Sequence, residues 1–460
     1  MALNRHDLTQ GGILKKLLQV AIPIMGTQLM QMVYNLTDMF WLGRTEQSVV
    51  AVAASGLAGM YLWLGMALML IGRMGSEIGT SQNMGRGDSE SSQGYAQDSV
   101  RVSLIFGVFY GLILLILAEP LVSLLQVKEQ NVFESTCDYL RIVSVGVPIT
   151  YVSAAITGVF NGAGNSRLSF WANATGLLVN MLLDPLMILV WGWDVKGAAI
   201  ATVIAQATVC ALFVVFVKRH PHRPFGLFRI FGPIDYTRFR QIMRWSFPIA
   251  LESGAFTILA MVVTGMASAW YGETAVAVQR VGSQIESLSW LIGGGFSSAV
   301  TAFVGQNYGA GKWSRIRRGY QISILSLLVW EAIVTLLLIF YGRGFFALFL
   351  REPPEILDMG TTYLRILAGC QLFMAFEGAC AGTFRGMGRT LPPSLCSIAT
   401  SLLRPVLCWW MAQWMGMNGL WMGITVSAIL RGILMFIWFT IYQRRIPKVD
   451  ESEPVILTTV

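Results

Sequence analysis

The sequence predicts an all-α integral membrane protein, with twelve transmembrane helices in two six-helix bundles related by a parallel internal repeat. Three observations predict this fold. Hydrophobic residues make up 55% of the chain and charged residues 13%, whereas ordinary soluble domains carry roughly 25% charged residues. Long apolar runs recur along all 460 residues, and the mean hydropathy is +0.60. Short motifs also recur at one constant offset.

The apolar runs are predicted to be membrane-spanning helices. A spanning helix needs about 20 apolar residues, and lipid offers no partner for unpaired backbone groups. The runs fall near residues 17–42, 48–72, 99–118, 139–160, 168–191, 197–217, 245–271, 282–305, 320–341, 362–384, 391–414 and 419–442.

Basic residues predict the orientation of these helices. Lys and Arg gather in the connection at 218–244, and again after the eighth run and after the twelfth. Connections on the other side contain acidic residues such as Glu129 and Glu134. Because basic loops stay on the cytoplasmic side, we expect a multi-pass protein of the cell inner (plasma) membrane with both termini in the cytoplasm.

Two halves of the chain repeat each other. The motif at 82–87 returns at 306–311 (306 − 82 = 224), and the glycine-rich turn at 158–164 returns at 382–388 with the same offset. Such self-similarity indicates a duplicated unit. Six helices per unit start both halves on the same side, which gives a parallel repeat of the kind found in one class of transporter. This symmetry favours a carrier over a channel or a scaffold.

The repeat and the basic connection divide the chain into four predicted parts. They are an N-lobe (1–217), a cytoplasmic connection (218–244), a C-lobe (245–445) and a cytoplasmic tail (446–460).

An ionisable residue within a membrane span is a candidate for function, because its insertion costs about 3 kcal/mol. Asp38 is the first such residue, and Gln28, Gln31 and Asn35 share its helix face. Pro23 removes a backbone hydrogen bond and predicts a bend in the same helix. The alternative is that Asp38 lies hydrated at the outer end of its span without a role.

The fifth run contains a second polar group. Asn180 and Asp184 are one helical turn apart, and Pro185 follows them. Their oxygens can accept a proton or bind Na⁺, because hard cations prefer oxygen ligands. Thr202 in the next run can add a hydroxyl group. The alternative interpretation is a polar kink that neighbouring helices satisfy.

The second half contains Glu252, Glu286, Glu331 and Glu377 within its spans, and Arg404 and Arg431 in later ones. Three of these acids, Glu252, Glu286 and Glu377, can form a substrate site or a secondary cation site, and Gln28 and Asn35 of the first half are candidates for the same roles. The same acids can instead pair with the arginines, and both interpretations stay open here. Glu331 is interpreted as structural.

Other classes of function lack their residues. The six cysteines are widely spaced and form no CxxC motif, and the three histidines lie in polar segments. We therefore expect no enzyme activity, no metal site apart from Na⁺ at Asp38, Asn180 and Asp184, and no cofactor. The basic loops are interpreted as topology signals, so the expected partners are the lipid bilayer and small molecules but not nucleic acid. The protein is expected to be a monomer.

With these motifs in view, residues 12–445 resemble the multidrug and toxic compound extrusion (MATE) family, and within it the DinF-like branch. The resemblance rests on the span from Pro23 to Asp38, the stretch 304–311 and the repeated turns at 158–164 and 382–388. It implies a two-lobe, MATE/MOP-like antiporter that exports amphipathic or cationic compounds against H⁺ or Na⁺ by alternating access. It further implies that the coupling site consists of Asp38, Asn180, Asp184 and Thr202. The first helix is then implied to bend at Pro23 when this site is protonated.

One departure from the family concerns the C-lobe. The NorM-like branch has a glutamate eight residues after the proline of the seventh span, where this chain has Phe256, whereas Glu252 stands four residues after Pro248. Glu377 is likewise about one turn from that branch's acid. The resemblance therefore favours the N-lobe site. The alternative function is a lipid-linked oligosaccharide flippase of the same superfamily, against which the mostly acidic mid-span residues argue.

Overall fold

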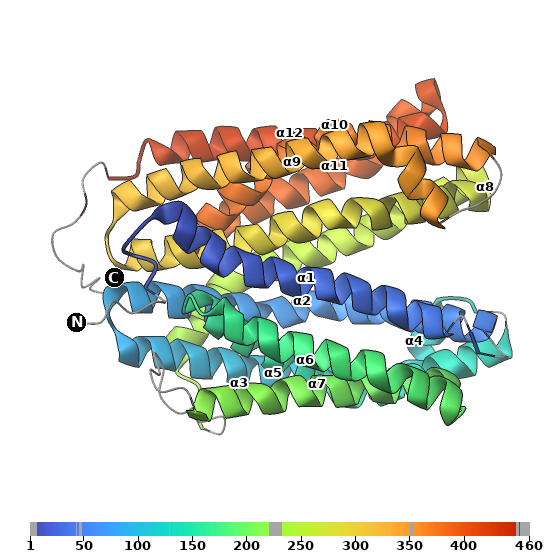
Figure 1. The fold of residues 1–460 in the computed structure, drawn as a ribbon, viewed down its shortest axis with the longest axis horizontal. Coiled ribbons are helices and arrows are strands. Elements are labelled where there is room, and N and C mark those ends of the chain that lie inside the picture. The colour runs from blue at the N-terminus through green and yellow to red at the C-terminus, as the bar shows by residue number, and fades with distance from the viewer. Residues whose placement is uncertain are drawn as a thin grey trace. The chain divides into compact units, whose positions relative to one another are not determined.

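The computed structural model describes residues 7–42, 44–45, 48–127, 129–219, 232–349, 354–447 and 450. Within these residues all regular secondary structure is helical (Figure 1). Twelve helices of the described ranges are long and apolar enough to cross a membrane. The predicted all-helical membrane fold is confirmed.

The first half contains α1 (Ile13–Leu42), α2 (Ser48–Arg86), α3 (Ser89–Ile116), α4 (Ala118–Leu124), α5 (Gln130–Gly162), α6 (Ser166–Pro185), the π-helical turn η1 (Leu186–Val190) and α7 (Asp194–Arg219). The second half contains α8 (Tyr236–Gly309), α9 (Trp313–Phe349), α10 (Pro354–Gly386), α11 (Leu391–Met415) and α12 (Met417–Gln443).

The helical stretch α8 contains two spans. Gly272 interrupts it with φ 75° and ψ −172°, which are not helical angles. A positive φ costs glycine little, because it has no Cβ. The break separates the spans Tyr236–Gly272 and Thr274–Gly309, which contain the predicted runs at 245–271 and 282–305.

Helix α2 continues well beyond its predicted apolar run at 48–72. The additional turns contain Ser76, Thr80 and Ser81, all fully buried. Ser76 donates a 2.7 Å hydrogen bond to the carbonyl oxygen of Ala155 on α5. Hydropathy therefore marks where the helix meets apolar surroundings, whereas polar turns packed on α5 extend the helix further.

By its contacts the chain forms two compact units. The first contains Ile22–Ala250, and the second contains Leu8–Ala21 together with the described residues from Leu251 onward. The divisions fall next to Pro23 and Pro248, in the first helix of each half. The predicted boundaries of the lobes, the connection and the tail remain predictions.

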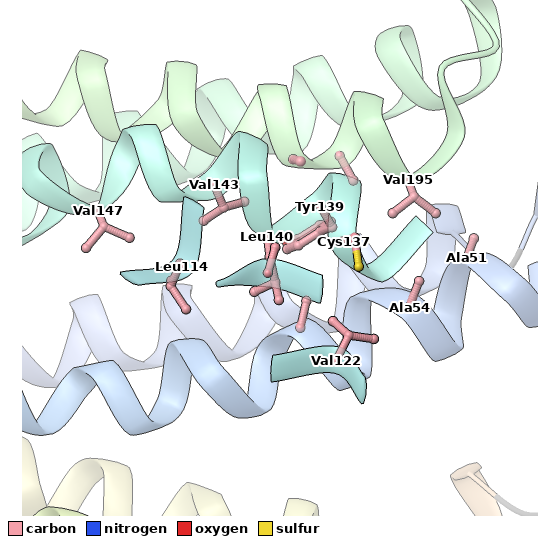
Figure 2. Close-up of a cluster of buried hydrophobic side chains, with 14 of the residues drawn as sticks. Ala51, Ala54, Leu114, Val122, Cys137, Tyr139, Leu140, Val143, Val147 and Val195 are labelled. Carbon is pink, nitrogen blue, oxygen red and sulfur yellow. The ribbon is translucent and has the colours of Figure 1, made fainter. Parts of the chain in front are cut away.

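Each unit has an apolar core of its own. In the first unit, Leu114, Leu140, Val143 and other side chains of α2, α3, α4, α5 and α7 form a buried cluster (Figure 2). In the second unit, a cluster around Val278, Leu338 and Trp421 joins α8, α9, α10, α11 and α12. Burial of apolar side chains in helix interfaces leaves the outward faces free for lipid.

The internal repeat is also visible in the packing of glycines. A Cβ at Gly162 would lie 2.5 Å from the carbonyl oxygen of Glu77, and a Cβ at Gly386 would lie 2.7 Å from that of Thr301. Both members of the second pair follow those of the first by 224 positions. Each duplicated turn thus packs closely against another helix of its own unit, Gly162 of α5 against α2 and Gly386 of α10 against α8.

Candidate cation-coupling site

Helix α1 approaches α6 closely at a glycine. A Cβ at Gly26 would lie 2.9 Å from Cε2 of Phe170, so a larger residue there would require the ring of Phe170 or the helix to shift. Three helical turns further along, Asp38 extends from α1. Oδ1 of Asp38 is buried and has no hydrogen-bond partner among the described residues.

Helix α6 contributes an amide–carboxylate pair. Nδ2 of Asn180 donates a 2.6 Å hydrogen bond to Oδ1 of Asp184, one turn along the helix. Asn180 and Asp184 are both buried, and within the described part of the chain Oδ2 of Asp184 has no hydrogen-bond partner. One oxygen of this carboxylate is therefore held in place, while the other can accept a further bond.

The helix changes its hydrogen bonding directly after this pair. Pro185 ends the α-helical part of α6 and the π-helical turn η1 follows. Proline has no amide hydrogen to donate and disturbs the regular bonding of a helix, and π turns occur often at functional sites. The α-helical part of α6 thus ends one residue after Asp184, at the Asp-Pro sequence.

The hydroxyl groups of Thr202 and Tyr34 contact each other in the same unit. Oγ1 of Thr202 on α7 donates to the carbonyl oxygen of Ala198 at 3.0 Å and lies 3.3 Å from the hydroxyl oxygen of Tyr34. Because the proton of Thr202 is committed to Ala198, Tyr34 is the donor in the second contact. Tyr34 in turn lies within electrostatic range of Asp38 and of Asp184.

The two acids also lie within electrostatic range of each other. The first unit therefore brings together Asp38, Asn180, Asp184 and Thr202, from three helices that are separate in the sequence. Two buried carboxylate oxygens in this group have no hydrogen-bond partner among the described residues. Chemically, such a group can bind a proton or a small hard cation.

Sequence reasoning missed two tyrosines of this site. Tyr34 precedes Asp38 by one helical turn, a spacing that could have identified it. Tyr139 on α5 is buried and lies within electrostatic range of Asp38 and Asp184. It belongs to a different helix from either acid, and no spacing in the sequence pointed to it.

The remaining candidates of α1 are less well defined. Pro23 lies within a helix that continues past it to Leu42, and its carbonyl oxygen accepts a 3.1 Å hydrogen bond from Thr27. Gln28 is partly exposed. Asn35 lies in the same helix, but its side chain is outside the described residues.

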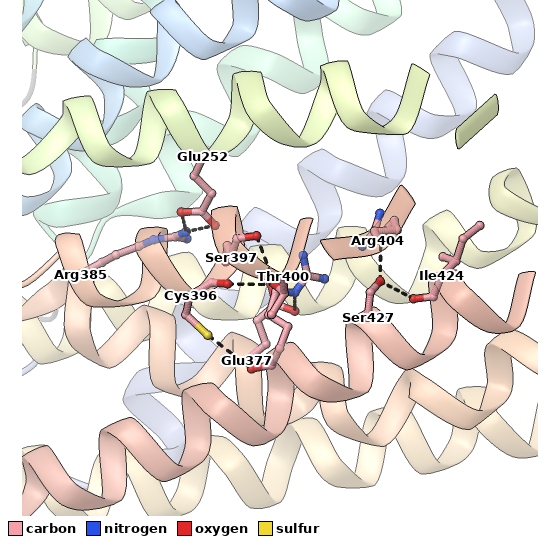
Figure 3. Close-up of polar contacts among 10 residues, drawn as sticks. Glu252, Glu377, Arg385, Cys396, Ser397, Thr400, Arg404, Ile424 and Ser427 are labelled. Atoms are coloured by element: carbon pink, nitrogen blue, oxygen red, sulfur yellow. Dashed lines mark hydrogen bonds and ion pairs between the residues drawn. The ribbon is translucent and has the colours of Figure 1, made fainter. Parts of the chain in front are cut away.

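In the second unit, two of the candidate acids pair with arginines (Figure 3). Glu252 lies 3.3 Å from Arg385 and accepts a 2.8 Å hydrogen bond from Ser394. Glu377 lies 2.8 Å from Nε of Arg431. Of the two interpretations that the sequence left open, these contacts favour pairing for both acids. Arg385 was not among the arginines considered from the sequence.

The third acid, Glu286, has a neutral partner. Its Oε1 accepts a 3.0 Å hydrogen bond from Nε2 of Gln371. Arg404 donates instead to Oγ of Ser427 at 2.9 Å, and its guanidinium group lies 5.3 Å from the ring centroid of Phe256. Phe256 thus packs on a cation at the position where the NorM-like branch has an acid.

Comparison with known proteins identifies the family. The MatE family model matches residues 23–186 and 248–410, which is well over half of the chain. The chain is 26% identical over 440 residues to NorM, a probable multidrug resistance protein of Thermotoga maritima, covering 93% of this chain and 92% of that protein. It is 23% identical over 442 residues to YpnP, a probable multidrug resistance protein of Bacillus subtilis, covering 95% and 97%.

A solved structure has the same fold. It is the outward-facing conformation of a multidrug resistance MATE family transporter of the MOP superfamily, with a TM-score of 0.90 and 23% identity over 98% of this chain and 100% of that one. The two matched segments of the family model correspond to the two halves of the repeat. This chain therefore belongs to the MatE family of membrane transporters.

Proposed function

We propose that this transporter exports amphipathic or cationic organic compounds by antiport with H⁺ or Na⁺, through alternating access. The site formed by Asp38, Asn180, Asp184 and Thr202 is the coupling site of this proposal. The membership of the protein in the DinF-like branch remains a prediction from the sequence.

The observation that carries the proposal is the pair of partnerless buried oxygens, Oδ1 of Asp38 and Oδ2 of Asp184. A buried acceptor without a partner costs about 1–3 kcal/mol, and more when it is charged. A cation that binds both carboxylates removes this cost, and opening the site to water on the other side removes it as well. Alternation between these two conditions is what coupled transport requires.

The same side-chain oxygens can bind either H⁺ or Na⁺. Protonation of one carboxylate leaves a single charge in the group, whereas Na⁺ would be bound by the oxygens of Asp38, Asp184 and Thr202. We favour H⁺, because two acids, one amide and one hydroxyl make a sparse set of ligands for a metal ion.

The contacts of the second unit support an exporter of cations over a lipid-linked oligosaccharide flippase. A flippase needs free basic groups for a pyrophosphate headgroup. Arg431 pairs with Glu377, and Arg404 contacts Ser427 and Phe256. These deep arginines already have partners, which argues against that alternative.

Transport by the purified protein in liposomes tests the function. Release of a fluorescent organic cation from the lumen is measured under an H⁺ gradient alone and under a Na⁺ gradient alone, with empty liposomes as the control. We expect the H⁺ gradient to drive transport and a protonophore to stop it. Transport that follows only the Na⁺ gradient would reassign the ion, and no transport under either gradient would refute antiport.

We also propose that the protein lies in the inner membrane as a monomer, with both termini in the cytoplasm. Cysteine labelling in a cysteine-free background tests the orientation. Glu90 follows the second span and Glu129 precedes the fourth, and both are exposed. An impermeant thiol reagent added to intact cells should label Glu129→Cys and spare Glu90→Cys, whereas the opposite pattern would invert the topology.

A further inference from the structure

Three buried side chains of the second unit, together with the partly exposed Glu286, form one series of hydrogen bonds. Oγ of Ser289 on α8 lies 2.6 Å from Oε2 of Glu331 on α9 and 2.7 Å from Oε1 of Gln371 on α10. Nε2 of Gln371 continues the series to Oε1 of Glu286 at 3.0 Å. Ser289, Gln371 and Glu331 are all at most 1% exposed, so water does not reach them.

This series of hydrogen bonds has fewer donor protons than its contacts require. The hydroxyl group of Ser289 has one proton, while an ionised Glu331 and the carbonyl group of Gln371 only accept. If Glu331 were ionised, one of the two short contacts of Ser289 would join two acceptors. A proton on Glu331 resolves this conflict, because its O–H then donates to Ser289, and Ser289 donates to Gln371.

The orientation of the Gln371 amide decides which acid carries the proton. If the amide were reversed, its oxygen would face Glu286, and that acid would have to supply the missing proton. However, Nε2 of Gln371 also donates a 3.1 Å hydrogen bond to the carbonyl oxygen of Leu367. Reversal would place two oxygens together there, so the amide stays as it is and the proton belongs to Glu331.

The charges around these side chains agree with this assignment. Glu286 lies within electrostatic range of Arg404 and Arg431, and close to Tyr363 and Cys370. Glu331 lies within electrostatic range of Glu286 but takes part in none of the ion pairs found among the described residues. The two arginines therefore favour a negative charge at Glu286 over one at Glu331, and an ionised, unpaired Glu331 in a dry interior would be strongly disfavoured.

We propose that Glu331 is a proton-binding site of the second unit, protonated at neutral pH, with Glu286 as its ionised partner. Loss of this proton would leave Ser289 able to satisfy only one of its two neighbours. Deprotonation therefore breaks a contact among α8, α9 and α10, which links the proton on Glu331 to the packing of these helices. This assignment goes beyond the ion proposed for the first unit and does not depend on it.

Infrared spectroscopy of the purified protein in lipid tests the proposal without a transport measurement. A protonated carboxyl group gives a C=O stretching band that an ionised one lacks, and the band shifts in D₂O. We compare the wild type with Glu331→Gln at neutral pH, with Glu286→Gln as the matched control. A glutamine amide at 331 can donate to Ser289 as the acid does, so this variant should fold.

The expected result is that Glu331→Gln loses one such band, while Glu286→Gln retains it. An unchanged band in Glu331→Gln, or its loss in Glu286→Gln instead, would overturn the assignment. Should Glu331→Gln fail to fold, Ser289→Ala gives a second measurement. Removal of the hydroxyl acceptor should shift the same band to higher frequency, and an unshifted spectrum would contradict the proposal.

Discussion

Asn180 donates a 2.6 Å hydrogen bond to Oδ1 of Asp184, and within the described residues Oδ2 of the same buried carboxylate has no hydrogen-bond partner. The amide cannot titrate, so it can hold the acid in one position whether or not a cation is bound. The first unit thus combines a fixed acceptor, at Asp184, with a second partnerless oxygen at Asp38.

Replacement of Asp38 should remove coupling without unfolding the protein. Asp38→Asn keeps the size and hydrogen bonding of the side chain but removes its charge and its titration. We expect normal insertion and loss of gradient-driven uptake of an organic cation into everted vesicles, which is export in their inverted orientation. Retention of efflux with its normal ion dependence would move the coupling role elsewhere, with Glu252 as the next candidate.

Asp38 and Asp184 should act as one unit. Two acids that share one low-dielectric pocket titrate together rather than independently. We expect Asp184→Asn to impair efflux as Asp38→Asn does, and the double variant to be little worse than either single variant. If each substitution lowers the efflux rate by its own factor and the factors multiply, the acids do not share a site.

Removal of the amide should destabilise the site. Asn180→Ala leaves both oxygens of a buried carboxylate without a protein partner, which costs about 1–3 kcal/mol. Asn173→Ala is the matched control on the same helix, because Asn173 is partly exposed and bonds to the backbone of Ser169. Thermal unfolding in detergent should show the larger loss for Asn180→Ala, and equal losses would argue against a special role.

The duplicated glycine turns should tolerate no side chain. A Cβ at Gly386 would lie 2.7 Å from the carbonyl oxygen of Thr301, so Gly386→Ala should lower stability by about 1–3 kcal/mol through overpacking. Gly265 is the control, because a Cβ there meets nothing within 4 Å. Gly265→Ala should be neutral or slightly stabilising. Unfolding temperatures in detergent compare the two, and an unaffected Gly386→Ala would show that the helices can separate there.

The start of α3 should depend on pH through Asp88. The carboxylate of Asp88 accepts a 2.9 Å hydrogen bond from the backbone N–H of Ser91. Hydrogen bonding to the side chain of Ser91, and next to its backbone N–H, lowers the pKa of Asp88. An acid with a lowered pKa stabilises the folded state above its unfolded pKa, near 3.9. That contribution is lost as the pH falls through the folded pKa.

Hydrogen exchange in the first turn of α3 measures this contribution. Asp88→Ala should speed exchange at neutral pH, because loss of a helix cap costs about 1 kcal/mol. Asp88→Asn keeps an acceptor oxygen and should exchange much like the wild type. The difference between the wild type and Asp88→Ala should shrink in acid to the difference between Asp88→Asn and Asp88→Ala, because a protonated carboxyl group keeps only a neutral acceptor oxygen. A difference that does not change with pH would exclude the charge of the carboxylate as a source.

The sequence predicted the helices and the repeat well, because both are written in local patterns. Apolar runs of spanning length and glycines at a constant offset can be read without knowing any contact. The pair formed by Asn180 and Asp184 was equally accessible, since one helical turn fixes its spacing. The polar extension of α2 was missed because Ser76 and Thr80 are buried against protein, which hydropathy does not register.

Contacts between helices could not be predicted in the same way. Arg431 pairs with Glu377 and Arg385 pairs with Glu252, but nothing in the sequence chooses between these acids. Glu331 was interpreted as structural because it stands alone on its helix face, whereas in the structure Ser289 connects it to Gln371 across two other helices. Tyr139 was also missed at the coupling site, because it lies on a different helix from Asp38 and Asp184. Tertiary packing decides such contacts, and single-helix periodicity contains no information about them.

The first turns of α1 belong to the second compact unit, and the first turns of α8, up to Ala250, belong to the first. The opening segment of each half of the duplicated chain therefore belongs to the compact unit formed mainly by the other half. A six-helix ancestor with this arrangement would have buried its own opening segment only on a second copy, as in a domain-swapped dimer. The duplication then made that exchange internal to one polypeptide. Cutting the chain between α7 and α8 should accordingly yield two fragments that are each incomplete alone and that fold only when produced together.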